Sequence, residues 1–342
     1  MKIAFTICSN NYLSLARVLG KSLIKHNPEY KFIIGLVDKK NPTISAYYED
    51  FEIVPCDEIG LAELDEMANK YSIAEFNTAV KPSYILYLFK RFPDAEQIVF
   101  VDPDMKVYDS FQELHNLHRS YDILLTPHIT QPIPVDGKEP SEVAYLATGT
   151  YNLGFLSVKR SPNTQKFMLW WAERLKDFCY FNFGLGLFVD QKWANMVPVF
   201  FESVFVIKHL GYNIAYWNIQ ERNITRKDGN YIVNGDFPLV IYHYSSVGIN
   251  KGLLFYKQQN RFKDADFPLV VELFKEYVKE VNEEGYQQTN PLPCHYVLLH
   301  NEFEKKRLKK SFSGWIKLMF KSIVPESSRR KIKRKMSDAL NV

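Results

Sequence analysis

The sequence predicts an α/β protein built on a mixed, mostly parallel sheet. Over the first 125 residues, short apolar runs alternate with segments whose apolar residues recur at helical spacing. Strands that alternate with helices indicate a mainly parallel sheet, and such sheets bind ligands at the carboxyl ends of their strands. At 342 residues and 46% hydrophobic, the chain is long enough to bury a large core.

The expected elements follow one another closely in this first part. The apolar run Ile3–Ile7 predicts a buried strand, and Leu13–His26 has the i, i+3, i+4 pattern of an amphipathic helix. Further strands are expected at Phe32–Val37, Glu52–Pro55 and Gln97–Val101, and further helices at Glu58–Lys70 and Lys81–Arg91.

The alternation loosens after a strand expected at Tyr121–Thr126. A polar, proline-containing stretch, Gln131–Ser141, is typical of a loop, and Asn163–Lys176 predicts a helix. Short strands are expected at Val204–Lys208, Tyr231–Val233 and Leu239–Tyr242. We expect one domain over residues 1–286 and a helical, basic extension over residues 287–342.

The formal charge of +4 is unevenly distributed. Residues 302–342 contain 13 Lys/Arg and 4 Asp/Glu, whereas residues 1–301 contain 30 basic and 35 acidic side chains. A mildly acidic body argues against a nucleic-acid-binding protein, because such a protein has its positive charge on the folded domain.

Cysteine usage and hydropathy indicate a cytoplasmic protein. The four cysteines are scattered without a C-x-x-C pair, which favours free thiols in a reducing compartment and provides no zinc site. The apolar run after Met1 is too short for a signal peptide, and no segment reaches the length needed to span a bilayer.

The central motif is Asp102-Pro103-Asp104, which follows the apolar strand Gln97–Val101. Two carboxylates one residue apart at a strand end offer the oxygen ligands that Mg²⁺ and Mn²⁺ use together with substrate phosphates. A solvated turn is the alternative for a D-x-D sequence taken alone.

Several stretches resemble bacterial glycosyltransferases of the A-type fold, and they are most similar to family 8, whose members transfer galactose or glucose in cell-surface polysaccharide assembly. The matching stretches are, in chain order, Ala79–Ser83, Leu86–Arg91, Val99–Asp104, Tyr151–Gly154, Phe188–Gln191 and Tyr242–Ser246 followed by Lys251. The resemblance covers roughly residues 1–255 and implies a single Rossmann-like domain that binds a nucleotide-sugar.

The resemblance implies a metal site. Asp102 and Asp104 would bind Mn²⁺ (or Mg²⁺), with Asp104 also near the donor ribose, and His243 would be the third protein ligand. A strand-end histidine with a purely structural role is the alternative for His243, although imidazole suits Mn²⁺ better than Mg²⁺.

The remaining donor contacts are expected at strand ends and in loops. Acidic and polar side chains after the first strands suit the ribose and base, and Asp38 has a turn or helix cap as its alternative role. Lys81 resembles the basic residue near the donor in the family, unless it pairs with Glu75. Lys251 is expected at the diphosphate, with Lys257 as a weaker candidate. The full set of expected donor-binding residues is Thr6, Cys8, Asn11, Asp38, Lys81, Asp102, Asp104, Asn152, Gly154 and Lys251.

The resemblance places Asp190 and Gln191 beside the anomeric carbon of the donor, as the catalytic pair of a retaining enzyme. In an inverting enzyme, Asp190 would instead be the base that deprotonates the acceptor hydroxyl. Asp190 as a cap of a helix at Gln191–Met196 is a third interpretation. The stretch Asn213–Asn218, followed by Glu221 and Arg222, also resembles related bacterial transferases, and its Trp217 is a candidate for stacking on a sugar or for a core position.

The C-terminal extension combines positive charge with apolar residues. Ser311–Val324 has Phe312, Trp315 and Ile316 on one predicted helix face, and basic runs flank it. Such a helix is typical of attachment to an anionic membrane surface, and packing on the body or a disordered arm are the alternatives.

Taken together, these features predict a metal-dependent transferase that moves a hexose from a UDP-sugar to a saccharide or lipid-linked acceptor, with retention, at the inner face of a bacterial membrane. An inverting transferase and a non-catalytic nucleotide-sugar-binding protein remain alternatives. A sugar nucleotidyltransferase is disfavoured, because Ile7–Tyr12 contains no glycine for a phosphate loop.

Overall fold

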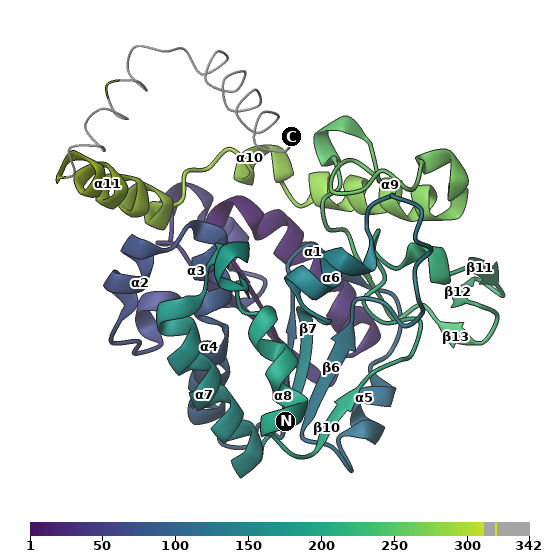
Figure 1. Cartoon of the computed structure of the whole chain (residues 1–342), viewed down its shortest axis with the longest axis horizontal. Coiled ribbons are helices and arrows are strands. Elements are labelled where there is room, and N and C mark those ends of the chain that lie inside the picture. The colour runs from purple at the N-terminus through teal and green to yellow at the C-terminus, as the bar shows by residue number, and fades with distance from the viewer. Residues whose placement is uncertain (311–318, 320–342) are drawn as a thin grey trace.

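A seven-stranded sheet forms the centre of the structure, a computed structural model that describes residues 1–310 and Met319 (Figure 1). The strand order is β10-β6-β7-β4-β1-β2-β3. β7 runs antiparallel to β4 and β6, and the other neighbouring pairs are parallel. The strands are β1 (Lys2–Cys8), β2 (Tyr30–Leu36), β3 (Glu52–Pro55), β4 (Gln97–Val101), β6 (Ile123–Pro127), β7 (Tyr151–Lys159) and β10 (Val204–Val206). The predicted mixed, mostly parallel sheet is confirmed.

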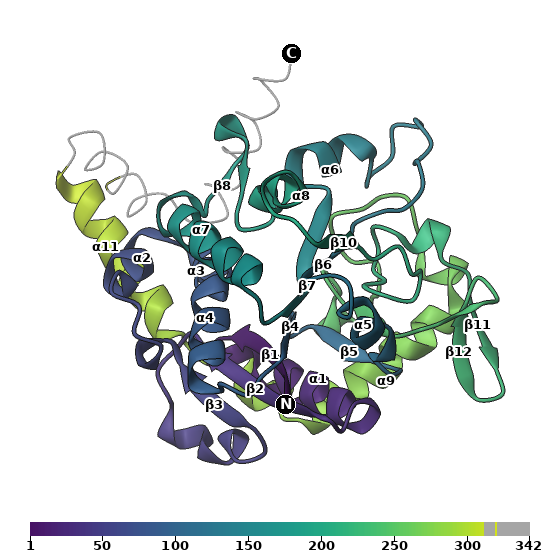
Figure 2. The same cartoon turned by 90° about the horizontal axis from the view of Figure 1, so that it is seen from below.

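Helices cover both faces of this sheet (Figure 2). In β1, Ile3 and Phe5 pack on the side of α4 and α7, whereas Ala4 and Cys8 pack on the side of α1 and α5. This alternation is the two-residue period of a strand that is buried on both faces. The helices are α1 (Leu13–His26), α2 (Leu64–Lys70), α3 (Ile73–Ala79), α4 (Lys81–Arg91), α5 (Gln112–Leu117) and α7 (Pro162–Phe178).

Most predicted elements of the first part have the observed bounds to within two residues. The helix predicted at Glu58–Lys70 is wrong in its first half, because α2 begins only at Leu64. Gly60 interrupts the segment with φ 73°, a left-handed conformation that cannot continue a right-handed helix.

A second layer surrounds the carboxyl edge of the sheet. β5 (Met105–Val107) pairs with β14 (Ile241–His243), so that His243 lies opposite Met105. Segment Gln131–Ser141 contains no helix or strand, as predicted. The other elements here are α6 (Glu142–Thr148), β8 (Phe181–Asn182), β9 (Leu187–Phe188), α8 (Val197–Phe200), β11 (Ile224–Lys227), β12 (Asn230–Val233), β13 (Phe237–Pro238) and α9 (Pro268–Glu283).

The last described segment returns to the N-terminal half. After α10 (Tyr286–Thr289), α11 (His295–Lys310) lies against α2. The predicted membrane helix at Ser311–Val324 falls, apart from Met319, outside the described residues. Within the described part of the chain, no helix has the length and apolar character needed to cross a bilayer.

Candidate functional site

The D-x-D carboxylates and His243 meet at the carboxyl edge of the sheet. Asp102 directly follows β4, and its backbone N–H donates to the carbonyl of Gly154 on β7 at 2.8 Å. Pairing of β5 with β14 brings His243 Nε2 to 3.1 Å from Asp104 Oδ1 and 3.9 Å from Asp102 Oδ2. One ligand atom from each residue lies within 4.8 Å of the others, the spacing of a metal site.

The hydrogen bond of His243 leaves its Nε2 atom, which faces the carboxylates, free to bind a metal. Nδ1 donates to Asn213 Oδ1 at 3.2 Å, so Nε2, on the side of the two carboxylates, carries the lone pair in the neutral ring. The Asn213 amide is oriented in turn, because its nitrogen donates to Thr126 and Asn152. Such an outer hydrogen bond is usual for metal-binding histidines.

The charges of the three groups are interdependent. Burial raises the pKa of Asp102 to about 6, although the positive charges of Lys81 and His243 oppose the rise. Because the Asp102 side chain is 32% exposed, water will moderate this shift. Burial lowers the pKa of His243, but the carboxylates of Asp104 and Asp102 outweigh burial and leave it raised. A divalent cation would relieve the repulsion between the carboxylates.

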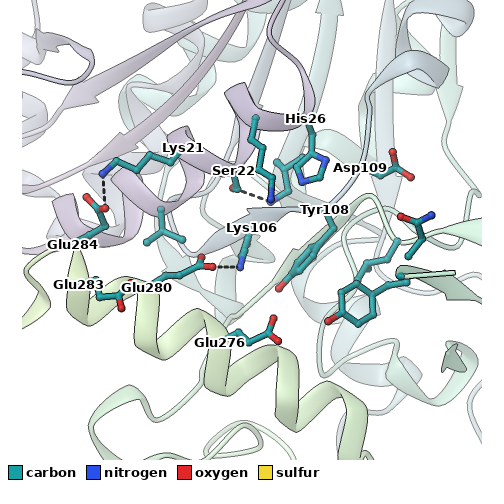
Figure 3. A pocket seen from close by; sticks show the side chains of 17 residues that line it. Lys21, Ser22, His26, Lys106, Tyr108, Asp109, Glu276, Glu280, Glu283 and Glu284 are labelled. Atoms are coloured by element: carbon teal, nitrogen blue, oxygen red, sulfur yellow. Dashed lines mark hydrogen bonds and ion pairs between the residues drawn. The ribbon is translucent and has the colours of Figure 1, made fainter. Parts of the chain in front are cut away.

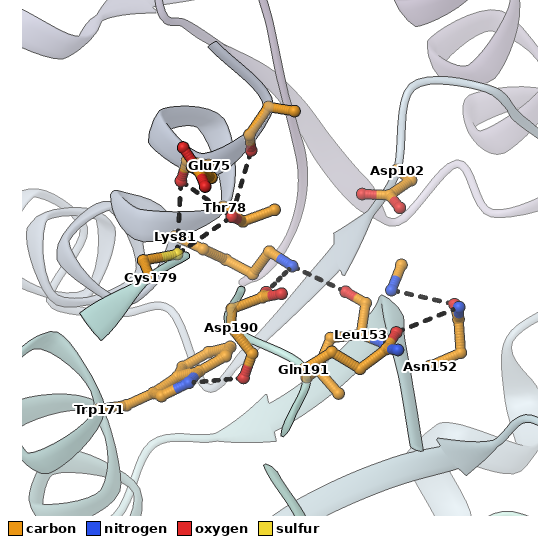
Figure 4. A network of polar contacts seen from close by, with 12 residues as sticks. Glu75, Thr78, Lys81, Asp102, Asn152, Leu153, Trp171, Cys179, Asp190 and Gln191 are labelled. Carbon is orange, nitrogen blue, oxygen red and sulfur yellow. Dashed lines mark hydrogen bonds and ion pairs between the residues drawn. The ribbon is translucent and has the colours of Figure 1, made fainter. Parts of the chain in front are cut away.

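A buried ion pair lies beside this group of ligands (Figure 4). Lys81 Nζ donates to Asp190 Oδ2 at 2.5 Å and to the Leu153 carbonyl at 2.8 Å, and both charged side chains are almost fully buried. The Lys81 ammonium also lies 4.1 Å from the centre of the Phe100 ring. Lys81 therefore pairs with Asp190, while Glu75 forms a capping box with Ser72 instead.

Asp190 is held as a charged partner and does not cap a helix. The following 3-10 helix, Lys192–Met196, has no side-chain cap. Burial raises the pKa of Asp190, while Lys81 lowers it through charge and a hydrogen bond. The Gln191 side chain connects two other segments of the site: it donates to the Thr148 carbonyl at 3.0 Å and accepts from the Asn152 amide at 3.4 Å.

Asn152 and Gly154 bring β7 into the site. Asn152 Oδ1 accepts from the Gly154 N–H at 3.1 Å, and its amide nitrogen lies 3.2 Å from His128 Nε2. A Cβ on Gly154 would lie 2.6 Å from Asp102 Oδ2 and 2.8 Å from His243 Cε1. Glycine is thus required here by the close approach of the ligands.

A cavity of about 320 Å³ adjoins the ligand group. The Trp217 ring contacts both, because it borders the cavity and lies edge-on to the His243 ring, with the ring centres 5.0 Å apart. Trp217 is 4% exposed, and its Nε1–H has no hydrogen-bond acceptor among the described residues. The wall is completed by aromatic and polar side chains, among them His128, Tyr145, Asn152, Phe188, Gln191 and Tyr216.

The residues expected at the nucleotide lie at the ends of β1 and β2. Thr6 and Cys8 are buried in the sheet, and burial raises the pKa of the Cys8 thiol. Asp38 is also buried, and its carboxylate accepts from the backbone N–H groups of Lys39 and His295 at 2.9 and 2.8 Å. Asp38 therefore ties the start of α11 to the sheet, while Asn11 is half-buried. Their contact with a nucleotide stays a prediction.

Lys251 lies apart from the ion pair of Lys81. It is exposed in a 3-10 helix, Ile249–Lys251, and its ammonium lies 5.1 Å from the centre of the Tyr256 ring. Lys257 contacts the same ring at 5.0 Å. The two lysines expected at a diphosphate thus flank one tyrosine, and their role stays a prediction.

A second cavity, of about 520 Å³, lies between α1, β5 and α9 and contains none of the expected site residues (Figure 3). Two ion pairs join its walls: Lys106 contacts Glu280 at 2.7 Å, and Lys21 contacts Glu284 at 2.5 Å. These pairs stabilise the packing of α9 and its C-terminal end on the body.

Sequence reasoning missed His128 and Tyr145, and it included Asn213 only as the first residue of the stretch Asn213–Asn218, without a role. His128 follows β6 and its ring stacks on Tyr145 at 5.1 Å. Asn213 has φ 50° and joins His243 to Asn152. A histidine directly after a strand at the ligand-binding edge was the available signal, whereas nothing in the sequence distinguishes Tyr145.

The sequence is similar to two uncharacterized proteins of Bacillus subtilis (strain 168). It is 25% identical to YfnF over 281 residues, which cover 81% of this chain and 91% of YfnF. It is 23% identical to YfnD over 250 residues, covering 70% of this chain and 76% of YfnD. No family model matches the chain.

Among solved structures, the chain is similar to several glycosyltransferases. The galactosyltransferase LgtC in complex with donor and acceptor sugar analogs has 17% identity and a TM-score of 0.48, with 82% of this chain and 95% of LgtC covered. The glycosyltransferase GlyE of Streptococcus pneumoniae TIGR4 has 15% identity and a TM-score of 0.46, with 90% of this chain and 64% of GlyE covered.

Proposed function

We propose that this protein is a metal-dependent glycosyltransferase that transfers a hexose from a UDP-sugar to a saccharide or lipid-linked acceptor in bacterial surface polysaccharide synthesis. The observation that carries the proposal is the convergence of Asp102, Asp104 and His243 beside a cavity with an aromatic and polar wall. The motif resemblance supplies the reaction class and the UDP preference.

The three ligand side chains fit a divalent cation. Two carboxylates and one imidazole leave positions for diphosphate oxygens, and this mixed set favours Mn²⁺. When bound, the ion would neutralise the negative charge that develops on the diphosphate leaving group. Asn213 would hold the His243 ring, and Gly154 would leave room for the ligands.

The cavity suits a sugar ring. Sugars offer apolar faces to aromatic rings and hydroxyl groups to hydrogen-bonding partners. Trp217 offers an aromatic ring, and Asn152 and Gln191 offer amide groups. We assign this cavity to the transferred sugar and the acceptor hydroxyl.

The buried ion pair favours retention over inversion. A general base must reach the acceptor hydroxyl and accept its proton. The Asp190 carboxylate instead contacts the Lys81 ammonium at 2.5 Å and is 2% exposed, so protonating it would leave the buried lysine charge uncompensated. In a retaining enzyme, Asp190 and Lys81 would fix the Gln191 loop, and Gln191 would lie beside the anomeric carbon.

Calorimetric titration of UDP and GDP, with Mn²⁺ or with EDTA, tests the proposal on wild type and Asp104→Ala. We expect UDP binding that requires Mn²⁺ and is lost in the variant. The control is Asp94→Ala, which removes an exposed carboxylate just before β4, at the opposite edge of the sheet.

Each other outcome has a defined meaning. Mn²⁺-dependent GDP binding would keep the site and change the donor. Absence of binding for both nucleotides would contradict the transferase proposal. NMR of the product from an active donor then distinguishes retention from inversion, and an inverted anomeric centre would contradict the positioning role of Asp190.

A further inference from the structure

Six large apolar side chains project into solvent from three segments of the chain, two of which border the cavity. They lie on α6, on the β8–β9 hairpin and on α8, and their exposed fractions range from 48% for Phe181 to 74% for Val199. Soluble monomers seldom expose apolar residues in such a group unless the surface binds something. We name this group the apolar collar: Leu146, Phe181, Phe183, Leu185, Val199 and Phe200.

The three segments of the collar are joined to one another. α6 lies against β9, and the Lys192 ammonium donates to the carbonyl of Leu146. Phe200 packs on Trp170 of α7 at 5.6 Å, and Trp170 contacts Trp193 at 6.1 Å, beside Lys192. In Figure 2, α6, α8 and β8 lie along the same side of the molecule.

The collar is continuous with the wall of the cavity. The Phe181 and Phe183 rings contact Phe188 at 5.1 and 5.6 Å, and Phe188 borders the cavity together with Gln191. On the other side, Thr148 of α6 borders the cavity while Leu146 of the same helix points outward at 72% exposure. An apolar chain attached to a sugar in the cavity would therefore emerge onto apolar side chains.

The last turn of α11 supplies exposed basic residues near the hairpin. α11 ends in Arg307, Lys309 and Lys310. Burial raises the pKa of Tyr180, directly before β8; the charges of Lys70 and Arg307 oppose the rise and those of Glu75 and Asp177 add to it, so charges of both signs lie at the base of the hairpin. Apolar side chains beside basic ones are the combination that binds the interface of an anionic bilayer.

We propose that the apolar collar inserts into the hydrocarbon edge of an anionic membrane, so that the cavity opens onto the lipid surface. The collar residues belong to segments other than the C-terminal stretch 311–342, for which the sequence predicts membrane attachment, and they would orient the body itself. The inference deepens the proposed function, on which it rests for the identity of the acceptor as a lipid-linked saccharide.

The test is a fluorescent probe on the hairpin of the full-length protein. The four native cysteines are buried, so a solvent-sensitive label will attach to an introduced cysteine in Phe183→Cys. With vesicles of phosphatidylcholine and phosphatidylglycerol, we expect a blue shift of its emission and quenching by brominated lipid chains. The matched control is Asp94→Cys, at the opposite edge of the sheet, where we expect neither change.

A second variant tests how much the hairpin contributes to the affinity for the vesicles. Phe181→Ser/Phe183→Ser/Leu185→Ser is expected to raise the lipid concentration for half-maximal binding at least about tenfold. Leu298→Ser, an exposed leucine on α11 outside the collar, should leave it unchanged. Both variants must give the circular dichroism spectrum of wild type, which shows that they are folded.

Three results would overturn the proposal: no binding of wild type to these vesicles, binding without a change at the Phe183→Cys label, or a lipid-free dimer in which that label is already shielded. The last would assign the collar to a second copy of the chain. UDP calorimetry on the same samples separates the two proposals. Vesicle insertion without nucleotide binding would contradict the transferase proposal and still support membrane insertion of the collar.

Discussion

At the scale of single residues, Gly154 decides how closely the ligands of the candidate metal site approach. It lies between Asp102 and His243, and its N–H binds Asn152. Its backbone has the conformation of an ordinary strand residue within β7, so an alanine there would not strain the backbone. The methyl group of that alanine would instead clash with neighbouring side chains. The space is needed by the site itself.

We therefore predict that Gly154→Ala weakens Mn²⁺-dependent UDP binding at least about tenfold, because the new methyl group displaces Asp102 or His243 by a fraction of an ångström. Isothermal calorimetry measures the effect. Gly184→Ala is the control, since a Cβ there meets its nearest neighbour, Asn182 Oδ1, at 3.4 Å. Wild-type affinity in Gly154→Ala would contradict the assignment of these ligands.

The contact between Lys81 and Asp190 shows how burial decides between alternative partners that the sequence allows. They lie 109 residues apart, and the sequence allowed Lys81 to pair with Glu75 and Asp190 to cap a helix. Because a buried charge without a partner costs several kcal/mol, two opposite charges buried at one place must pair. The resemblance anticipated both residues near the donor, but only packing decided their mutual contact.

At the scale of elements, a buried polar network joins α5 to the centre of the sheet. His118, which follows α5, donates from Nδ1 to the Tyr121 carbonyl at 3.0 Å, and its Nε2 accepts from Ser157 of β7 at 2.7 Å. Ser157 also accepts from Gln97 of β4. The network holds the antiparallel strand β7 against β4, and it requires a neutral His118 ring.

This network predicts a pH-dependent stability. Burial lowers the pKa of His118 from 6.5 to about 4. Between these values the unfolded chain binds a proton that the folded protein excludes, so stability falls as pH decreases from 6.5 towards 4, by about 3 kcal/mol at most for this residue. Above pH 6.5 the contribution is fully present.

Urea unfolding of wild type and His118→Gln between pH 7.5 and 4.5 checks the prediction. At pH 7.5 the variant should be less stable by about 1–2 kcal/mol, because it loses hydrogen bonds in a buried position. The difference should shrink as the pH decreases, since only wild type carries the titrating ring. A difference that stays constant over this range would contradict a lowered pKa.

At the scale of the whole molecule, α11 ties the C-terminal part to the N-terminal half of the sheet. The Tyr296 ring packs against Phe76 at 5.2 Å, and its hydroxyl accepts from the Cys56 thiol at 3.2 Å. His300 reaches the Asn69 carbonyl at 2.8 Å. The domain division predicted at residues 286 and 287 stays a prediction, but the start of α11 belongs to the core of the body.

We predict that Tyr296→Ala lowers the free energy of unfolding by about 3–5 kcal/mol, because a large ring that is 3% exposed leaves a cavity. The matched control on the same helix is Leu298→Ala, whose side chain is 54% exposed and should change stability by less than about 0.5 kcal/mol. Equal, small effects of both substitutions would mean that α11 does not pack on the body in solution.

The sequence by itself determined the α/β class and most element positions. Hydrophobic periodicity is a local property, so the bounds of α1, α4, β3 and β4 follow directly from it. The D-x-D sequence after β4 predicted carboxylates at the ligand-binding edge for the same reason. The early start predicted for α2 failed because periodicity does not register the backbone conformation that Gly60 adopts.

Tertiary structure alone decided which distant residues meet. The contact of His243 with Asp104 depends on the pairing of β14 with β5, and the hydrogen bond from His243 to Asn213 depends on the segment around Ile214, which lies beside β14. The cavity and the apolar collar are likewise assembled from segments separated along the chain. Such proximities arise from the burial of whole elements against one another, which a local pattern does not encode.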